Sequence, residues 1–401
     1  MNKLLRKYID FSFLLFVFLF CIRYNRTLPF REIISVYFCS PIIELLPFNI
    51  INNIFFDFKE FYTELNNGIS DTLSELIIQV TLLLVSLSVP ILLLTIKYFR
   101  DRNYLPIAIL LIKYYLAFTL TYYGLAKMFS QQFLQFDLQT LNTTFGDASP
   151  MNLAWAFYGY SYYYQFFIGL VEVSSILILF KRTERLGTII TFIVTLNIVT
   201  INYFFNIPMK LMASYLFIFS IVLVINNWSK LKPILFDVAE EFSSCKVLFC
   251  SKNNKRLMKI ILKYLLITYY LINTIYHLNN MRVLSEIYTK NRPKMYGIYN
   301  VYDKNIDSLL NTIVDKNDWK QLIIEYENYV TIKNKDNSLY NYDFTFDSIN
   351  HTIILSNDEI GPRIIFKVTK IDSNSFLLLG EDTLIIKKQN MSYNLIPNFK
   401  K

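Results

Sequence analysis

Charged side chains are scarce in this sequence. Asp, Glu, Lys and Arg make up 18% of the 401 residues and apolar types make up 54%, whereas a soluble domain usually carries about a quarter charged residues. The shortage is uneven, because charges are sparse between about residues 73 and 228 and dense after about residue 282. This distribution excludes a single soluble domain and predicts a membrane-embedded part followed by a water-soluble module.

Histidine and cysteine are also rare. The sequence holds two histidines and four cysteines, which are His277, His351, Cys21, Cys39, Cys245 and Cys250. No two of the cysteines form a CxxC pair. We therefore expect no metal site, no haem and no iron–sulfur cluster, and the sequence does not support thiol–disulfide chemistry.

A nucleic-acid motif and a basic face are missing too, although the net charge is +9. The basic residues stand in short clusters beside apolar runs, which is how Lys and Arg set the orientation of membrane helices. We expect the lipid bilayer, and not nucleic acid, as the partner of this charge.

The apolar runs predict about seven transmembrane helices, since a span needs about twenty mostly apolar residues. Their ranges are 9–21, 73–98, 105–128, 157–180, 186–205, 209–228 and 260–281. The first run has a basic start and a short apolar core, as a signal peptide does, but no small-residue cleavage site follows it. We therefore predict that it is retained as a helix.

Loop charges predict the orientation of these spans. The loops at 100–102, 181–185 and 230–259 are basic, whereas the loop at 131–155 carries two acidic residues and no Lys or Arg. The excess of Lys and Arg marks the cytoplasmic side. We expect a multi-pass protein of the cell inner membrane with a cytoplasmic N-terminus, an outer loop with short interfacial helices at 23–72, and an extracytoplasmic C-terminal domain.

After about residue 319 the hydrophobic period changes to that of β-strands. Seven short runs separated by turn residues are expected at 321–325, 329–332, 342–346, 352–355, 364–368, 375–379 and 383–387. Their spacing of about ten residues predicts an antiparallel all-β domain, a small barrel or half-barrel. Residues 282–318 are expected to be a linker with a short helix at 306–314. The tail holds no nucleophile–base pair, and His351 is interpreted as a surface residue.

Polar groups at bilayer depth are costly and are functional candidates by default. Lys113 and Glu172 each lie about eight residues from the expected inner end of their span, or about 12 Å deep. The sequence predicts an ion pair between them. It either fixes the register of two helices or leaves a protonatable Glu172 facing a cavity.

A second candidate site lies at the expected outer ends of the third to sixth spans. Polar and aromatic residues gather there, namely Tyr123, Lys127, Gln132, Tyr160, Ser161, Tyr164, Asn202 and Lys210. One interpretation is an interfacial belt of tyrosines with snorkelling lysines and amides that join helices. The other is a ligand site for an anionic or quinone-like head group.

A series of short motifs follows the order found in a known family. They are Tyr123–Gly124 with Lys127 and Phe129, Gln132–Phe133, Leu153–Ala154–Trp155, Gly159–Tyr160–Ser161, and Gly169 with Glu172. On these residues the segment 105–232 resembles the DoxX-like integral membrane family. The tail, with its Tyr296–Gly297 entry and Trp319–Lys320, is similar to that of bacteroidete members with a C-terminal extracytoplasmic β domain. The resemblance implies a four-helix core and a link to quinone-dependent redox chemistry, although most members have no assigned activity.

Together these patterns divide the chain into four regions. Residues 1–104 hold two spans, 105–232 the DoxX-like core, 233–281 a basic cytoplasmic loop and the last span, and 282–401 the linker and β domain. Three functions remain open. The first is an accessory redox subunit that binds a quinone or lipid-like partner, with no independent catalytic activity expected. The others are a non-catalytic scaffold or assembly factor whose β domain binds an envelope protein, and a transporter of a small solute or lipid.

Overall fold

The computed structural model describes most of the chain in ten stretches. These are residues 3–24, 71–134, 136–235, 254–290, 292–303, 318–347, 349–357, 361–372, 374–380 and 383–389. The chain divides into two compact units. One comprises Met1–Gln132 and Tyr162–Asn280, and the other comprises Phe133–Ser161 and Met281–Lys401. The expected outer loop at 23–72, apart from its ends, and the expected helix at 306–314 lie outside the described residues.

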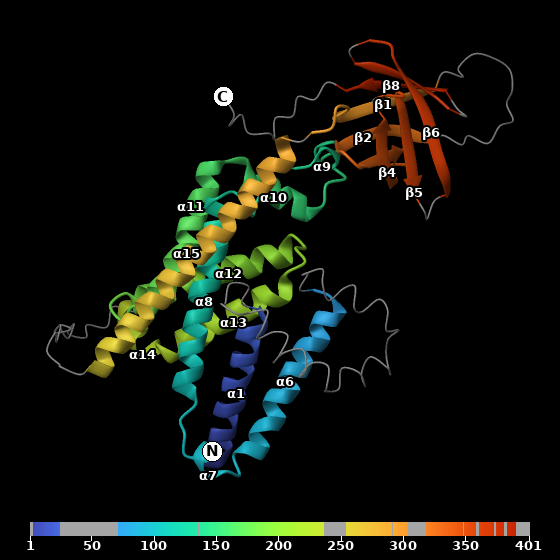
Figure 1. The fold of residues 1–401 in the computed structure, drawn as a ribbon. Helices are drawn as coiled ribbons and strands as arrows, with labels where there is room; N and C mark the ends of the chain where they lie inside the picture. Colours follow the sequence, from blue (N-terminus) through green and yellow to red (C-terminus); the bar gives the residue numbers. More distant parts are fainter. Residues whose placement is uncertain are drawn as a thin grey trace. The chain divides into compact units, whose positions relative to one another are not determined.

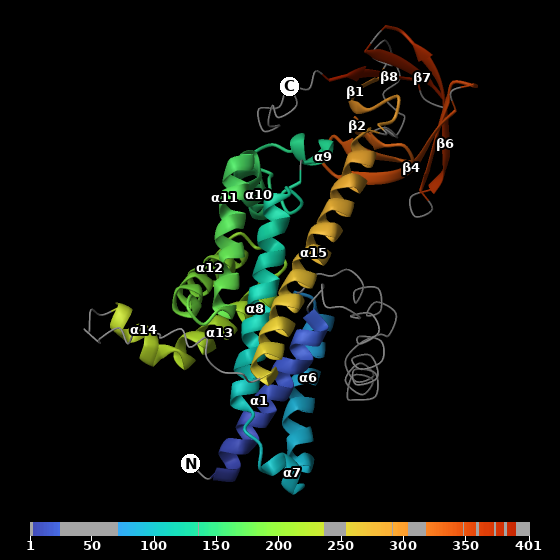
Figure 2. The same cartoon turned by 60° about the vertical axis from the view of Figure 1, so that its left-hand side comes forward.

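The first unit is helical. Its elements are α1 (Lys3–Tyr24), α6 (Leu73–Leu93), α7 (Lys97–Arg100), α8 (Leu105–Met128), α11 (Tyr162–Val173), the 3₁₀ helix η2 (Ser174–Leu179), α12 (Glu184–Phe204), α13 (Lys210–Asn226), α14 (Trp228–Leu235) and α15 (Asn254–Lys290). Helices α1, α6 and α8 run side by side (Figures 1 and 2). Within the described residues, four segments are long and apolar enough to cross a membrane: Glu75–Leu93, Leu105–Met128, Tyr162–Leu179 and Glu184–Phe204.

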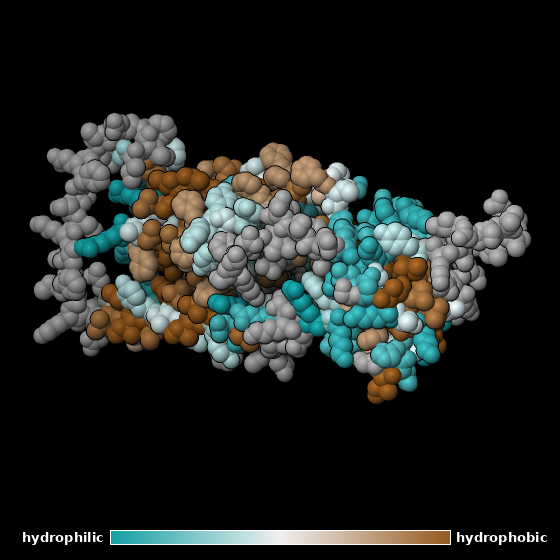
Figure 3. Space-filling view, turned by 90° about the horizontal axis from the view of Figure 1, so that it is seen from above, coloured by the Kyte–Doolittle hydropathy of each residue, from teal (hydrophilic) through white to brown (hydrophobic). Residues whose placement is uncertain are grey.

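The burial pattern of these helices is that of lipid-facing elements. Along α6, Leu76, Val80 and Leu83 are exposed, whereas Gln79 and Thr81 are buried. An apolar outer face with polar groups turned inward is expected where the surrounding solvent is hydrocarbon. In Figure 3 hydrophobic residues cover much of the helical part, and hydrophilic residues predominate on the barrel.

The expected span at 157–180 is wrong at its beginning. The structure interrupts this segment at Ser161, whose φ of −109° and ψ of 119° are extended, and thereby separates α10 (Pro150–Tyr160) from α11. Helix α10 belongs to the second unit and α11 to the first. Hydropathy alone misses this break, because the residues on both sides of Ser161 are aromatic.

The second unit contains a closed antiparallel barrel. Its strands are β1 (Gly297–Asp303), β2 (Trp319–Tyr326), β3 (Tyr329–Asn334), β4 (Leu339–Asp347), β5 (Thr352–Asn357), β6 (Gly361–Lys370), β7 (Ser375–Leu379) and β8 (Thr383–Lys388). The expected antiparallel β domain is confirmed, and of the two forms expected for it, a barrel or a half-barrel, the structure shows the closed barrel. Strand β1 was wrongly assigned to the linker, and its pairing with β8, Val301 opposite Ile386, closes the sheet.

Side chains fill the interior of the barrel. Trp319, Tyr299, Tyr342 and Phe366 are buried there, in a core to which all eight strands contribute. The Trp319 ring lies 6.1 Å from that of Phe366 and 6.4 Å from that of Tyr342. A small eight-stranded barrel leaves an interior just wide enough for side chains, and here they form one packed core.

Candidate functional site

The most deeply buried ion pair of the described residues joins α8 to α11. The Lys127 Nζ lies 2.7 Å from the Glu172 Oε2, and the two side chains are 7% and 5% exposed. Lys127 stands in the last turn of α8, where a cation also interacts favourably with the helix dipole. The pair therefore places two opposite charges inside the helical unit, between two segments of membrane-spanning length.

Two glycines bring these helices together. A Cβ added to Gly124 would lie 2.5 Å from the Gly169 carbonyl oxygen, and one added to Gly169 would lie 2.4 Å from the Gly124 oxygen. Small residues at such a contact let the backbones of membrane helices approach closely. The contact fixes the axial register that sets Glu172 beside Lys127.

The predicted Lys113–Glu172 pair is wrong. Lys113 instead contacts Glu184 at the beginning of α12. The prediction assumed that the inner ends of α8 and of the following span are level. Lys113 and Lys127 are about 21 Å apart along α8 at 1.5 Å per residue, and the glycine contact brings Glu172 within reach of Lys127.

Lys210 has a different carboxylate partner. Its Nζ lies 3.2 Å from the Asp71 Oδ2, and the Leu211 backbone N–H donates to the Asp71 Oδ1 at 3.0 Å. Asp71 thus caps the N-terminus of α13, where negative charge is favoured. Burial would raise the pKa of the Asp71 carboxyl, but the bonds from Leu211 and Lys210 outweigh it, and the pKa is lowered.

The other residues of the predicted outer site are divided between the two units. The Tyr123 hydroxyl lies 3.7 Å from the Met212 sulfur, and the Asn202 side chain donates to the Ile198 carbonyl of its own helix at 2.8 Å. Tyr164 in α11 is 38% exposed, and Gln132 is the last residue of its stretch of the first unit. Tyr160 and Ser161 belong to the second unit.

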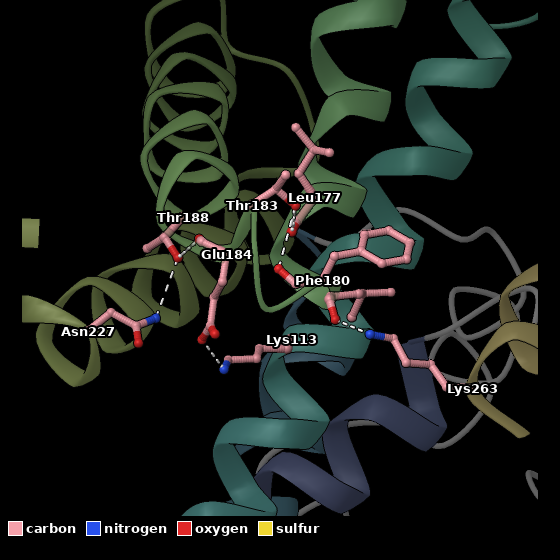
Figure 4. A network of polar contacts seen from close by, with 9 residues as sticks. Lys113, Leu177, Phe180, Thr183, Glu184, Thr188, Asn227 and Lys263 are labelled. Atoms are coloured by element: carbon pink, nitrogen blue, oxygen red, sulfur yellow. Dashed lines mark hydrogen bonds and ion pairs between the residues drawn. The ribbon is translucent and has the colours of Figure 1, made fainter. Parts of the chain in front are cut away.

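A polar network that the sequence analysis missed surrounds the turn between η2 and α12 (Figure 4). Besides the Lys113–Glu184 pair, the Lys263 ammonium donates to the Leu179 carbonyl oxygen, and the Thr188 hydroxyl donates to the Glu184 carbonyl at 2.7 Å. The basic loop at 181–185 was recognised only as a topology signal. Its neighbours come from segments far apart in the sequence.

A second missed contact lies within the barrel unit. The Leu138 backbone N–H donates to the Glu325 Oε2 at 2.9 Å, and the Asn142 side chain donates to the Gln321 Oε1 at 2.6 Å. Leu138 is also buried against Ile298 and Ile323. The short helix α9 (Leu138–Leu141) is therefore docked on β1 and β2, although the sequence places it in a loop between two membrane helices.

We call this docking the α9–barrel contact (Leu138 and Asn142 against Gln321, Ile323 and Glu325). Burial at the contact raises the pKa of the Glu325 carboxyl. The Leu138 N–H and Arg292 oppose the rise, and the negative charge of Asp137 adds to it.

Among the described residues, no three His, Cys, Asp or Glu side chains come together as a metal site would require.

Comparison with known proteins connects the chain to one relative and leaves the resemblance to the DoxX-like family a prediction. No family model matches the chain, and no solved structure matches it. The chain is 35% identical over 111 residues to the uncharacterized protein YwoB of Bacillus subtilis (strain 168). The matched segment covers 27% of this chain and 70% of YwoB. The chain therefore belongs to the family of YwoB.

Proposed function

We propose that this protein is a non-catalytic membrane scaffold that presents its β-barrel to an envelope protein. The α9–barrel contact carries the proposal. Because α9 lies between α8 and α11 in the sequence, the barrel unit is joined to the helical unit at three points of the chain, at 132/133, 161/162 and 280/281. A barrel tethered by one flexible linker would have no second segment of the chain docked on it. Here the hydrogen bonds and apolar contact of α9 attach such a segment to β1 and β2.

The proposal includes the full topology expected from the sequence. Beside the four segments of membrane-spanning length, α1, α13 and α15 complete seven spans in the cell inner membrane, with the N-terminus cytoplasmic and the barrel extracytoplasmic. Helix α15 has 37 residues and is about 55 Å long, so it exceeds a hydrocarbon core of about 30 Å. Its exposed Leu262, Leu265 and Ile272 support contact with lipid.

Two contacts weigh against the alternative of a quinone-like ligand at the outer ends of α8 to α13. That alternative relies on Lys127 and Lys210 to bind a head group, and each of them contacts a carboxylate instead. A transporter built on a Lys113–Glu172 pair loses its motivating feature as well, because these residues have different partners. The scaffold needs neither site.

Site-specific photo-crosslinking in cells tests the scaffold. A crosslinking amino acid replaces Tyr329, Asp343 or Thr345, which are exposed on neighbouring strands β3 and β4. We expect these positions to crosslink to one and the same envelope protein. The matched control replaces the lipid-exposed Ile272 of α15, from which that protein should not be recovered.

A second variant tests the role of the α9–barrel contact. Leu138→Asp places a charge against Ile298 and Ile323, so it should release α9 and reduce the crosslinking yield severalfold while the barrel stays folded. Recovery of the same partners from a chain lacking residues 282–401 would refute the scaffold, as would the absence of crosslinks from all three barrel positions.

A further inference from the structure

Four lysines and one carboxylate gather at the turn between η2 and α12, and we call this group the basic junction (Lys113, Lys181, Lys230, Lys263 and Glu184). Glu184 interacts electrostatically with Lys113 and Lys230. Lys263 does so with Glu184, Lys181 and Lys113. The five residues come from α8, the turn, α12, α14 and α15. All of them belong to the helical unit.

The inner part of the basic junction is built from well-defined contacts. Lys113 is paired with Glu184, and both side chains are less than a fifth exposed. The Lys263 Nζ lies 4.7 Å from the centre of the Phe180 ring, over its face, and also donates to the Leu179 carbonyl. Figure 4 shows Lys113 and Lys263 on either side of this turn.

The outer part of the junction is open and positively charged. Lys181 and Lys230 are exposed. Four ammonium groups and one carboxylate leave three positive charges that the junction itself does not neutralise. Such an excess attracts an anion, because each basic group near a membrane surface contributes about 1 kcal/mol to the binding of anionic lipid.

Neighbouring residues place the outer part of the junction at head-group depth. Trp228 is 45% exposed at the beginning of α14, and Leu231, one turn on, is buried. Tryptophan is enriched at the membrane–water interface, and a short amphipathic helix with lysines on its polar side lies in that plane. Lys181 and Lys230 therefore stand where lipid phosphates lie, on the side that the loop charges mark as cytoplasmic.

We propose that the basic junction binds a phosphate group, supplied by an anionic phospholipid of the cytoplasmic leaflet. A free phosphate ion offers the same chemistry, and the experiment distinguishes the two sources. The site lies in the other unit of the chain from the barrel, so it does not depend on the scaffold role, whereas the choice of leaflet rests on the proposed orientation.

Lipid binding to the purified full-length protein tests the site. Native mass spectrometry follows a titration with phosphatidylglycerol or with phosphatidylcholine of the same acyl chains. We expect tighter binding of phosphatidylglycerol, and the variant Lys181→Gln/Lys230→Gln should weaken it about 30-fold. Both lysines are exposed, so their replacement leaves the fold intact.

A matched control removes two basic groups from the same side of the protein at a distance from the junction. Lys97→Gln/Arg100→Gln changes exposed residues of α7 and should alter the affinity less than twofold. An equal loss in both variants, or equal binding of the two lipids, overturns the proposal. Titration with inorganic phosphate in detergent is the last arm, and phosphate binding with the same lysine dependence but no lipid preference would overturn the lipid source.

Discussion

Lys127 and Glu172 are costly residues that the helical unit tolerates only as a pair. Removing two charges from water costs several kcal/mol per ion, and their attraction offsets this cost only when the geometry is good. At 2.7 Å with almost no exposure, the pair meets that condition. Its contribution is therefore measured best by comparing single and double replacements.

Lys127→Ala should lower the free energy of unfolding by about 3–5 kcal/mol, because it leaves Glu172 buried without its partner. The double variant Lys127→Met/Glu172→Leu should restore the wild-type value or exceed it. Unfolding of the full-length protein in detergent micelles measures both. As a control, Arg282→Ala breaks a pair whose side chains are 56% and 47% exposed and should cost less than about 0.5 kcal/mol. A double variant as unstable as Lys127→Ala would show that more than this pairing is lost.

Glu325 makes the stability of the barrel unit depend on pH. Its pKa is raised above the ordinary value of 4.5, chiefly by burial. A raised pKa stabilises the folded state below pH 4.5, and that contribution is lost as the pH rises through the folded pKa. The stability of Glu325→Gln relative to that of the wild type should therefore be higher at pH 7 than at pH 4. Thermal unfolding of both proteins at the two pH values measures this difference.

Asp347 supplies a control of opposite sign for this measurement. Backbone N–H groups of Asn350 and Ile349 donate to its carboxylate and lower its pKa from 3.8. Its contribution is present above pH 3.8 and is lost as the pH falls through the folded pKa. Asp347→Asn should therefore lower the stability of the folded protein more at pH 7 than at low pH. The same trend in both variants would contradict the assignment.

At the scale of elements, the contact of α8 with α11 depends on the lack of two side chains. Gly124→Ala brings a Cβ against the Gly169 carbonyl, a backbone atom that moves only with its helix. We expect a loss of about 1–3 kcal/mol, as is typical of overpacking, again by unfolding in micelles. Gly146→Ala is the matched control, because nothing lies within 4 Å of its added Cβ. Equal stability of the two variants would refute the close approach.

The strands show what a local pattern predicts and what it misses. Short apolar runs at a spacing of about ten residues, each bounded by turn residues, indicated β2 to β8. Strand β1 is a short apolar run as well, but 15 residues separate Asp303 from Trp319. Only its pairing with β2 and β8 makes it a strand of the barrel.

At the scale of the whole molecule, the proposed topology predicts which positions face each side of the membrane. In a chain with Cys39, Cys245 and Cys250 replaced by Ser, Thr345→Cys on β4 should react with an impermeant maleimide in intact spheroplasts. Arg182→Cys should react only after the membrane is permeabilised. Both positions are exposed, and the remaining Cys21 is buried. The opposite labelling order would overturn the orientation.

The sequence by itself determined the division into apolar helices of membrane-spanning length and an antiparallel β domain. Hydropathy and strand alternation are properties of short segments and can be read without knowledge of distant residues. The tertiary structure decided that Lys127, and not Lys113, meets Glu172, that α9 docks on the barrel, and that β1 closes it. These outcomes depend on the axial register of packed helices and on pairing between residues far apart in the chain, which no local pattern specifies.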